Sequence, residues 1–269
     1  MQTIIIKIKT NFMKYQDKFD TYKFVFSELV KRDFKKKYKR TVLGMAWSVL
    51  SPLLMLLVMS LVFTHFFGRN TPHYNSYLFA GYLVYKYFSE ATSQGMSAFV
   101  GNAHIFTKVT VPKYLFLFSR NMQELINFAL NMVVFFIFCV FDHIRFSWHF
   151  IALIYPISML FIFNTGVSLI LACIYVFFKD TKYLWTVALR LILYMSAIYY
   201  RVDSYPEKVQ RLFLMNPVFV YGKYIRVIVI DNSYVGLRYM GLCAFYAFLA
   251  LGLGVFLYRK TNTKFLYYL

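Results

Sequence analysis

Five ionisable residues lie inside long apolar stretches of this sequence, where a charge is costly and therefore needs an explanation. Lys86 and Glu90 are four residues apart, as are Arg120 and Glu124, so each pair shares one face of a helix. We expect both to be ion pairs that face protein or a water-filled cavity; contact with a charged substrate and snorkelling to the membrane interface are the alternatives. Arg190 has no acidic residue four positions away, and we expect it to meet one of the glutamates or a phosphate of the substrate.

Tyrosine is also common within these apolar stretches, not only at their ends. A buried tyrosine hydroxyl needs a hydrogen-bond partner, which lipid tails do not provide. Tyr85, Tyr194, Tyr199 and Tyr200 can therefore line a hydrated path for a polar substrate such as a sugar, because rings pack on sugar faces while hydroxyls exchange hydrogen bonds. An aromatic belt combined with ordinary core packing is the alternative.

The sequence lacks the residue patterns that carry enzyme chemistry. It contains no GxxxxGK[ST] phosphate-binding loop and no convincing Ser/His/Asp or paired-carboxylate arrangement. Its five histidines are scattered, and its three cysteines lie far apart in apolar runs, without the spacing of a metal site or a disulfide framework. We expect no catalytic residue, no metal site and no cofactor bound by this chain.

The composition indicates a membrane protein. Of the 269 residues, 60% are hydrophobic and only 15% are charged, whereas soluble domains have about 25% charged residues. The net charge of +19 could indicate nucleic-acid binding, but 12 of the 30 Lys and Arg residues lie in the first 40 residues, before any segment that can span a bilayer. Membrane orientation explains this distribution better.

Six segments are apolar enough and long enough to span the hydrocarbon core as helices. Their approximate ranges are 42–67, 77–99, 115–141, 148–178, 183–200 and 239–258. With the N-terminus in the cytoplasm, 19 of the 30 Lys and Arg residues fall on inner segments and eight on outer ones, which places both termini inside. We therefore predict a single all-α membrane domain over residues 1–269.

Residues 201–238 are not an ordinary loop. They are too apolar to be solvated, yet Arg, Lys and Asn216-Pro217 interrupt them too often for one spanning helix. We expect two short helices, broken at Asn216-Pro217, that lie in or dip into the outer leaflet as an extracytoplasmic re-entrant segment. A seventh span of low hydrophobicity, which would put the C-terminus outside, is the alternative.

Residues 22–38 have the pattern of an amphipathic helix. Apolar side chains between Tyr22 and Tyr38 occupy roughly one half of a helical wheel, and basic side chains cluster opposite. Such a helix suits the cytoplasmic membrane interface, where it can serve as an orientation signal and bind anionic lipid. The chain then turns near Gly44 and enters the first span, with Trp47 at the depth where indole rings anchor.

The stretch KRDFKKKYKRTVLGMAWSVLSPL, residues 31–53, resembles the signature of permease subunits of type-2 ABC transporters that export O-antigen, capsule and teichoic-acid polymers. Further resemblances follow in the family's order: NAHIFTKVTVP from Asn102, Lys179-Asp180, and Asn216-Pro217 followed by Tyr224 and Arg226. One position departs from the pattern. Where the family tends to have Ser-Pro, this chain has Ser196-Ala197, so the shape of that helix ending is not predicted.

This resemblance implies a six-span permease that works as a homodimer with two copies of a separate ATPase, in the cytoplasmic membrane of a bacterium. ATP and Mg²⁺ would bind the ATPase, and the cargo would be a lipid-linked polysaccharide or polyol-phosphate polymer. The amphipathic helix and the inner loops would dock on the ATPase and transmit its movement. The residues expected to couple the subunits are Arg32, Asp33, Lys35, Lys36, Lys108 and Asp180.

Other functions remain as alternatives. A membrane glycosyltransferase or ligase acting on lipid-linked sugars would need acidic catalytic residues, and the outer segment offers Asp203, Glu207 and Asp231 without a recognisable motif. A drug- or lipid-exporting permease of the same superfamily is a second alternative, and a membrane sensor or scaffold is a third. The sequence does not identify the polymer, and part of substrate selection is expected to lie in the ATPase partner.

Overall fold

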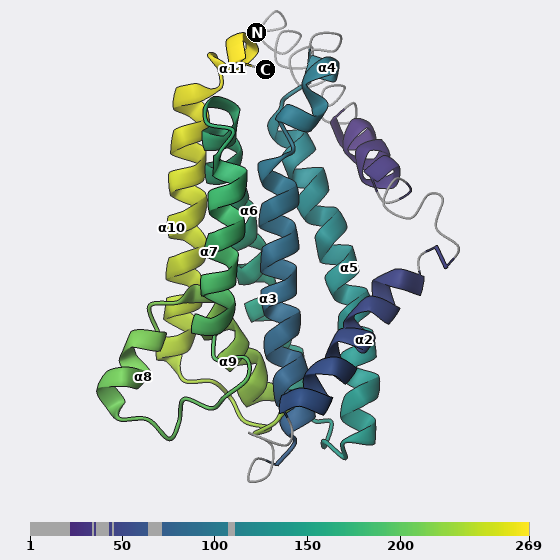
Figure 1. Ribbon diagram of the computed structural model, residues 1–269, viewed down its shortest axis with the longest axis vertical. Coiled ribbons are helices and arrows are strands. Elements are labelled where there is room, and N and C mark those ends of the chain that lie inside the picture. Colours follow the sequence, from purple (N-terminus) through teal and green to yellow (C-terminus); the bar gives the residue numbers. More distant parts are fainter. Residues whose placement is uncertain are drawn as a thin grey trace, which may run out of the picture.

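The computed structural model describes residues 22–33, 35, 43–44, 46–63, 72–106 and 111–268, with only the backbone of residues 266 and 267. Every regular element within these ranges is a helix, which confirms the predicted all-α class (Figure 1). The α-helices are α2 (Ala46–Phe63), α3 (Tyr74–Met96), α4 (Ala103–Phe106), α5 (Tyr114–Phe141), α6 (Ile154–Phe177), α7 (Thr181–Met195), α8 (Glu207–Phe213), α9 (Pro217–Val229), α10 (Leu237–Thr261) and α11 (Phe265–Tyr268). Two 3₁₀ helices, η2 (Val100–Asn102) and η3 (Trp148–Leu153), precede α4 and α6.

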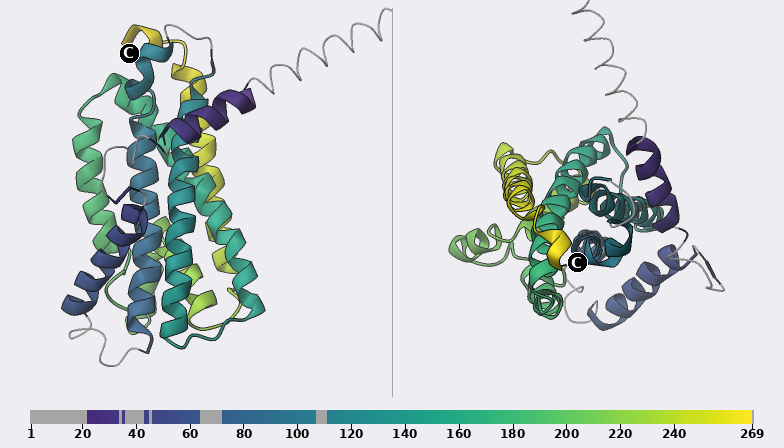
Figure 2. Two further views of the ribbon diagram at one scale, coloured as in Figure 1. Left: turned by 90° about the vertical axis from the view of Figure 1, so that its right-hand side faces the viewer. Right: turned by 90° about the horizontal axis from the view of Figure 1, so that it is seen from above.

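Residues 22–33 and 35 are also helical, and we call them the N-terminal helix, drawn in purple in Figure 1. Helices α3, α5, α6, α7 and α10 run along the long axis of the molecule as one bundle (Figure 1). Helix α2 is inclined against this bundle on the same side as the N-terminal helix, whereas α8 and α10 lie on the opposite side (Figure 2). Because α11 lies at one end of the bundle and α9 at the other, we call these the α11 end and the α9 end (Figure 1).

The main core surrounds α3, which packs against α5, α6 and α9. Of its 23 residues, 15 are buried, and Phe79, Val84 and Ala91 have no exposed surface. In α2, by contrast, only Pro52, Leu56 and Met59 are buried. Because α3 is enclosed by protein, its polar residues can be satisfied by neighbouring helices.

Helices α6 and α10 pack along much of their length, and glycines let their backbones touch. A Cβ added to Gly166 on α6 would lie 2.4 Å from the backbone carbonyl carbon of Ala250 on α10. A Cβ added to Gly254 on α10 would lie 2.7 Å from the carbonyl oxygen of Gly166. Both distances are too short for any side chain, so this crossing requires glycine on both helices.

Four described helices are long and apolar enough to cross a membrane: α2, α5, α10 and the continuous pair η3–α6. Helix α2 corresponds to the predicted first span, α5 to the third, η3–α6 to the fourth and α10 to the sixth. The bounds of α5, η3–α6 and α10 agree with the predicted ranges to within three residues. The predicted second and fifth spans coincide with α3 and α7. Helix α3 is too polar to meet the same test, and α7, with 15 residues, is too short. The six-span topology therefore remains a prediction.

Residues 201–238 form two short helices, α8 and α9, as predicted, and the two differ in direction by 107°. The side chain of Asn216 starts α9 by accepting a hydrogen bond from the N–H of Val218 (3.0 Å), and Pro217 occupies the first turn. Helix α9 packs within the bundle against α3 and α10, with Tyr221 and Ile228 fully buried. Helix α9 is therefore covered by protein, and its position in the outer leaflet stays a prediction.

Candidate functional site

Asp33 joins the N-terminal helix to the bundle. Its side chain is 1% exposed and forms ion pairs with Arg32 on the same helix (2.8 Å) and with Arg120 on α5 (3.2 Å). Arg32 Nη2 also donates a hydrogen bond to Oδ1 of Asn102 in η2 (3.0 Å). We call Asp33, Arg32, Arg120 and Asn102 the Asp33 clamp, because together they connect the N-terminal helix, α5 and η2.

The clamp is electrostatically matched and reinforced by apolar contacts. A buried carboxylate needs opposite charge to offset the free energy of leaving water. Here Oδ1 of Asp33 faces the guanidinium group of Arg32, and Oδ2 faces that of Arg120. Leu29 of the N-terminal helix is buried, and the ring of Phe26 lies 5.4 Å from that of Phe118 on α5. Lys23 and Lys31 are exposed. The N-terminal helix therefore packs apolar side chains on α5 and keeps lysines outside.

The other residues predicted to couple the subunits lie near the α11 end or outside the described residues. Lys35 is exposed beyond the clamp, and Asp180 is exposed just before α7. Lys36 and Lys108 lie outside the described residues. The N-terminal helix and the connection between α6 and α7 both lie towards the α11 end, but on different sides of the bundle (Figure 1).

Of the two ion pairs predicted along α3 and α5, the structure contains the first and replaces the second. Lys86 and Glu90 form a long ion pair of 3.9 Å, whereas Arg120 pairs with Asp33 and not with Glu124. Arg120 pairs with a residue of another helix because the buried carboxylate of Asp33 lies next to it and is shielded from water. Lys86, Glu90 and Glu124 line one cavity of about 10 Å³ between α3 and α5, which is the space that a single water needs.

The residues predicted to line a substrate path lie on α3, on α7 and in the turn after α7. Tyr85 donates a hydrogen bond to the carbonyl oxygen of Leu189 (3.0 Å), and the ring of Tyr199 stacks on that of Phe63 with centroids 4.4 Å apart. Arg190 is exposed on α7. These contacts connect α7 and its final turn to α3 and α2.

Tyr194 and Tyr200 line an apolar cavity of about 860 Å³. The cavity lies between α3, α6, α7 and the break between α8 and α9, with Phe88, Phe163 and Trp185 on its walls. Tyr85, Tyr199 and Arg190 do not line it. The structure therefore brings two of the five predicted path residues into one cavity.

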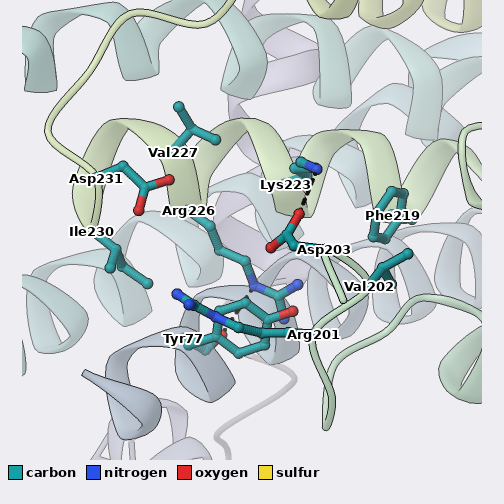
Figure 3. Close-up of a pocket in the computed structure, with 10 residues that line it drawn as sticks. All are labelled: Tyr77, Arg201, Val202, Asp203, Phe219, Lys223, Arg226, Val227, Ile230 and Asp231. Atoms are coloured by element: carbon teal, nitrogen blue, oxygen red, sulfur yellow. Dashed lines mark hydrogen bonds and ion pairs between the residues drawn. The ribbon is translucent and has the colours of Figure 1, made fainter. Parts of the chain in front are cut away.

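Arg226 on α9 ties the α9 end together. Its side chain donates to the carbonyl oxygens of Tyr77 (Nε, 3.1 Å), Ala197 (Nη1, 3.1 Å) and Ile198 (Nη2, 3.3 Å). The guanidinium carbon also lies 3.6 Å from the centroid of the Tyr77 ring (Figure 3). A Cβ at Gly81 would lie 2.1 Å from Nη2 of Arg226, so the arginine needs a glycine on α3 beside it.

Ala197 explains how α7 ends where the family pattern has proline. The helix stops at Met195, and Ala197 adopts a positive φ of 46° that turns its carbonyl group towards Arg226. Proline fixes φ near −65°, so it cannot adopt this conformation. The substitution of alanine for proline therefore accompanies a left-handed helix ending.

A pocket of about 180 Å³ opens beside Arg226 at the α9 end (Figure 3). Arg201, Asp203, Lys223 and Asp231 contribute its other charged side chains, and Lys223 forms an ion pair with Asp203 (3.0 Å). Burial raises the pKa of Asp231 above its ordinary value, and Arg201 opposes this shift. In the described part of the chain, no group of three His, Cys, Asp or Glu residues is placed to hold a metal ion.

Sequence reasoning did not select Arg226 or Arg201 as site residues. Arg226 could have been selected from the sequence, because it is a charged residue in an apolar stretch and belongs to one of the motif matches. Arg201 had none, because it follows a predicted span as an ordinary flanking cation.

Residues 25–230 match the family model described as ABC-2 type transporter. The chain is 28% identical over 192 residues to the O-antigen export system permease protein RfbA of Klebsiella pneumoniae, covering 71% of this chain and 74% of that protein. It is 27% identical over 201 residues to RfbA of Myxococcus xanthus, covering 73% and 76%. It is 23% identical over 247 residues to the polysialic acid transport protein KpsM of Escherichia coli, covering 90% and 95%.

Proposed function

Because the chain belongs to the ABC-2 type transporter family, we propose that it is the membrane subunit of a bacterial ATP-driven exporter of a lipid-linked polysaccharide or polyol-phosphate polymer. The observation that carries this proposal is the family match over residues 25–230, together with relatives named as an O-antigen export system permease and a polysialic acid transport protein. The polyol-phosphate class rests on the sequence motif alone.

The ATPase is a separate subunit in this proposal, because the chain has no phosphate-binding loop of its own. Two copies of the ATPase hold ATP and Mg²⁺ and act on two copies of this chain. The exposed faces of α2 and α7, which include Leu61 and Leu191, suit contact with the second copy or with lipid.

Coupling runs through the N-terminal helix. Its exposed lysines, such as Lys31 and Lys35, face a docked ATPase, while Asp33 holds the other side of the helix to α5. A push on the helix then reaches α5 through an ion pair and η2 through Asn102. In this arrangement Asp33 transmits movement inside the permease, and the lysines make the contact with the ATPase.

The six-span topology is part of the same proposal, with both termini in the cytoplasm. Helix α3 crosses the membrane although it is polar, because most of its surface is covered by other helices. Helix α7 has 15 residues, which rise about 22 Å, and the turn through Tyr200 extends it. The α11 end then faces the cytoplasm and the α9 end faces outwards.

The polymer passes along α7 and its final turn, near Arg190, Tyr194 and Tyr200. Tyr85 and Tyr199 lie on the neighbouring wall. The apolar cavity that Tyr194 and Tyr200 line, together with the exposed position of Arg190, supports this path.

Deletion of the gene for this chain in its host tests the function. We expect the surface polymer to disappear and its lipid-linked form to accumulate on the cytoplasmic side, with both effects reversed by the wild-type chain. Extraction of lipid-linked glycans and surface labelling with a polymer-specific antibody measure the two pools. Normal surface polymer without cytoplasmic accumulation would contradict the proposal.

A further inference from the structure

Two arginines share the pocket at the α9 end, and both lie close to the ring of Tyr77. The guanidinium carbons of Arg226 and Arg201 are 3.6 and 5.4 Å from the ring centroid. Both arginines line the 180 Å³ pocket, together with Val202 and Phe219 (Figure 3). Neither guanidinium has a carboxylate of the described residues within 4.0 Å.

The charges around the pocket do not balance. Lys223 and Asp203 neutralise each other in their ion pair. Two guanidinium groups then remain against one carboxylate, Asp231, which keeps contact with solvent but loses enough of its hydration for its pKa to rise. The pocket therefore keeps a net positive charge of at least one.

Unused hydrogen-bond donors also face this region. A guanidinium has five N–H groups, and Arg226, which is 5% exposed, donates three hydrogen bonds. Nε of Arg201 is shielded from solvent and has no hydrogen-bond partner among the described residues. Lys223 donates one hydrogen bond, to Asp203. A group rich in acceptors would satisfy these donors.

The pocket is too large to be filled by a single water. One water needs roughly 10–15 Å³ on this measure, and the pocket has about 180 Å³. Oxygen atoms of phosphate and carboxylate groups match the fork of a guanidinium in geometry and in charge.

We propose that this pocket, formed by Arg201, Arg226 and Lys223, binds an oxyanion, either a phosphate or a carboxylate group. The group can belong to the exported polymer or to a phospholipid headgroup, since both present such oxygens. Arg226 is the fixed element, because three backbone carbonyls hold it in place. Arg201 completes the site from the turn after α7.

Inorganic phosphate is the first probe. Purified protein in a neutral detergent is titrated with phosphate, against sodium chloride of equal ionic strength, and binding is followed by calorimetry and thermal unfolding. We expect saturable binding by the wild type, a loss of at least tenfold in affinity for Arg201→Gln, and a smaller loss for Arg201→Lys, which keeps the charge but not the fork. Arg226 is left unchanged, because its replacement removes three hydrogen bonds that hold the fold.

Arg211→Gln is the matched control. Arg211 is an exposed arginine on α8, paired with Glu207 at 3.4 Å, and it does not line the pocket. We expect it to bind phosphate as the wild type does. Absence of saturable binding, or equal losses in Arg201→Gln and Arg211→Gln, would overturn the proposal.

Competition identifies the source of the oxyanion. An oligosaccharide carrying carboxylate or phosphate groups should displace phosphate more strongly than its neutral analogue if the polymer is the ligand. Nanodiscs with anionic lipid should weaken phosphate binding relative to zwitterionic nanodiscs if a headgroup is the ligand. If neither displaces phosphate, the site has no ligand of the proposed kind. These measurements need no ATPase and no export, so they fail or succeed independently of the proposed function.

Discussion

Replacing Asp33 by asparagine removes the charge of the Asp33 clamp while keeping the shape of the side chain. Breaking a buried ion pair typically costs about 3–5 kcal/mol. Here the side chains of Arg32 and Arg120 are 38% and 19% exposed, so water replaces part of the lost interaction. The asparagine oxygen also keeps accepting the two hydrogen bonds that Nε and Nη2 of Arg32 donate to Oδ1 of Asp33. We therefore expect the docking of the N-terminal helix on α5 to weaken by about 2–3 kcal/mol.

Hydrogen exchange measures this loss directly. A change of 2–3 kcal/mol corresponds to a shift of about 30- to 150-fold in the docking equilibrium. Amides of residues 22–33 should exchange faster by that factor in Asp33→Asn, while amides of α6 and α10 should not change. In the reconstituted complex, the amount of polymer exported per ATP should fall while basal ATP hydrolysis continues.

Two further variants test whether the loss comes from the Asp33–Arg120 ion pair. Glu28→Gln breaks an ion pair with Lys31 on the same helix, but those side chains are 51% and 65% exposed, so it should cost less than about 1 kcal/mol. A double-mutant cycle with Asp33→Asn and Arg120→Gln should give effects that are not additive, because both changes remove one interaction. Additive effects, or unchanged exchange in Asp33→Asn, would refute the reasoning.

Three further predictions concern the α9 end. Ala197→Pro should destabilise the protein by about 3 kcal/mol or more, because proline cannot adopt φ of 46°, whereas Ala197→Gly should stabilise it by up to about 1 kcal/mol; thermal unfolding measures both. Gly81→Ala should cost about 1–3 kcal/mol by displacing Arg226, while Gly101→Ala, with no atom within 4 Å of the added carbon, should change stability by less than about 0.5 kcal/mol. The raised pKa of Asp231 means that its protonated form favours folding, so this contribution is complete below the ordinary pKa of 3.8 and is lost as pH rises through the higher folded value. The free energy of unfolding should therefore fall less steeply with rising pH above about 4 in Asp231→Asn than in the wild type. An identical slope in the two proteins would contradict this.

The sequence predicted the elements whose signal is local. Helices α5 and α10 are continuous apolar stretches of sufficient length, so composition alone located them to within three residues. The break at Asn216 was also predicted, because a side-chain cap followed by proline starts a helix wherever it occurs.

The remaining features depend on contacts between distant residues. Spacing along α5 suggested that Arg120 pairs with Glu124, but the competing partner, Asp33, is 87 positions earlier in the chain. For the same reason Asp33 was expected on a docking surface, and only the packed helices show that it is enclosed. The length of α7 depends on Ala197, whose left-handed backbone is held by an arginine of α9.

The glycine crossing of α6 and α10 determines where the molecule can bend. With Gly166 and Gly254 at the contact, the two backbones have no side chains between them that could change rotamer and absorb a tilt. The contact at these two glycines therefore resists a change in the angle between α6 and α10. We therefore expect a transport cycle to move α2, α7 and the N-terminal helix relative to the packed pair of α6 and α10.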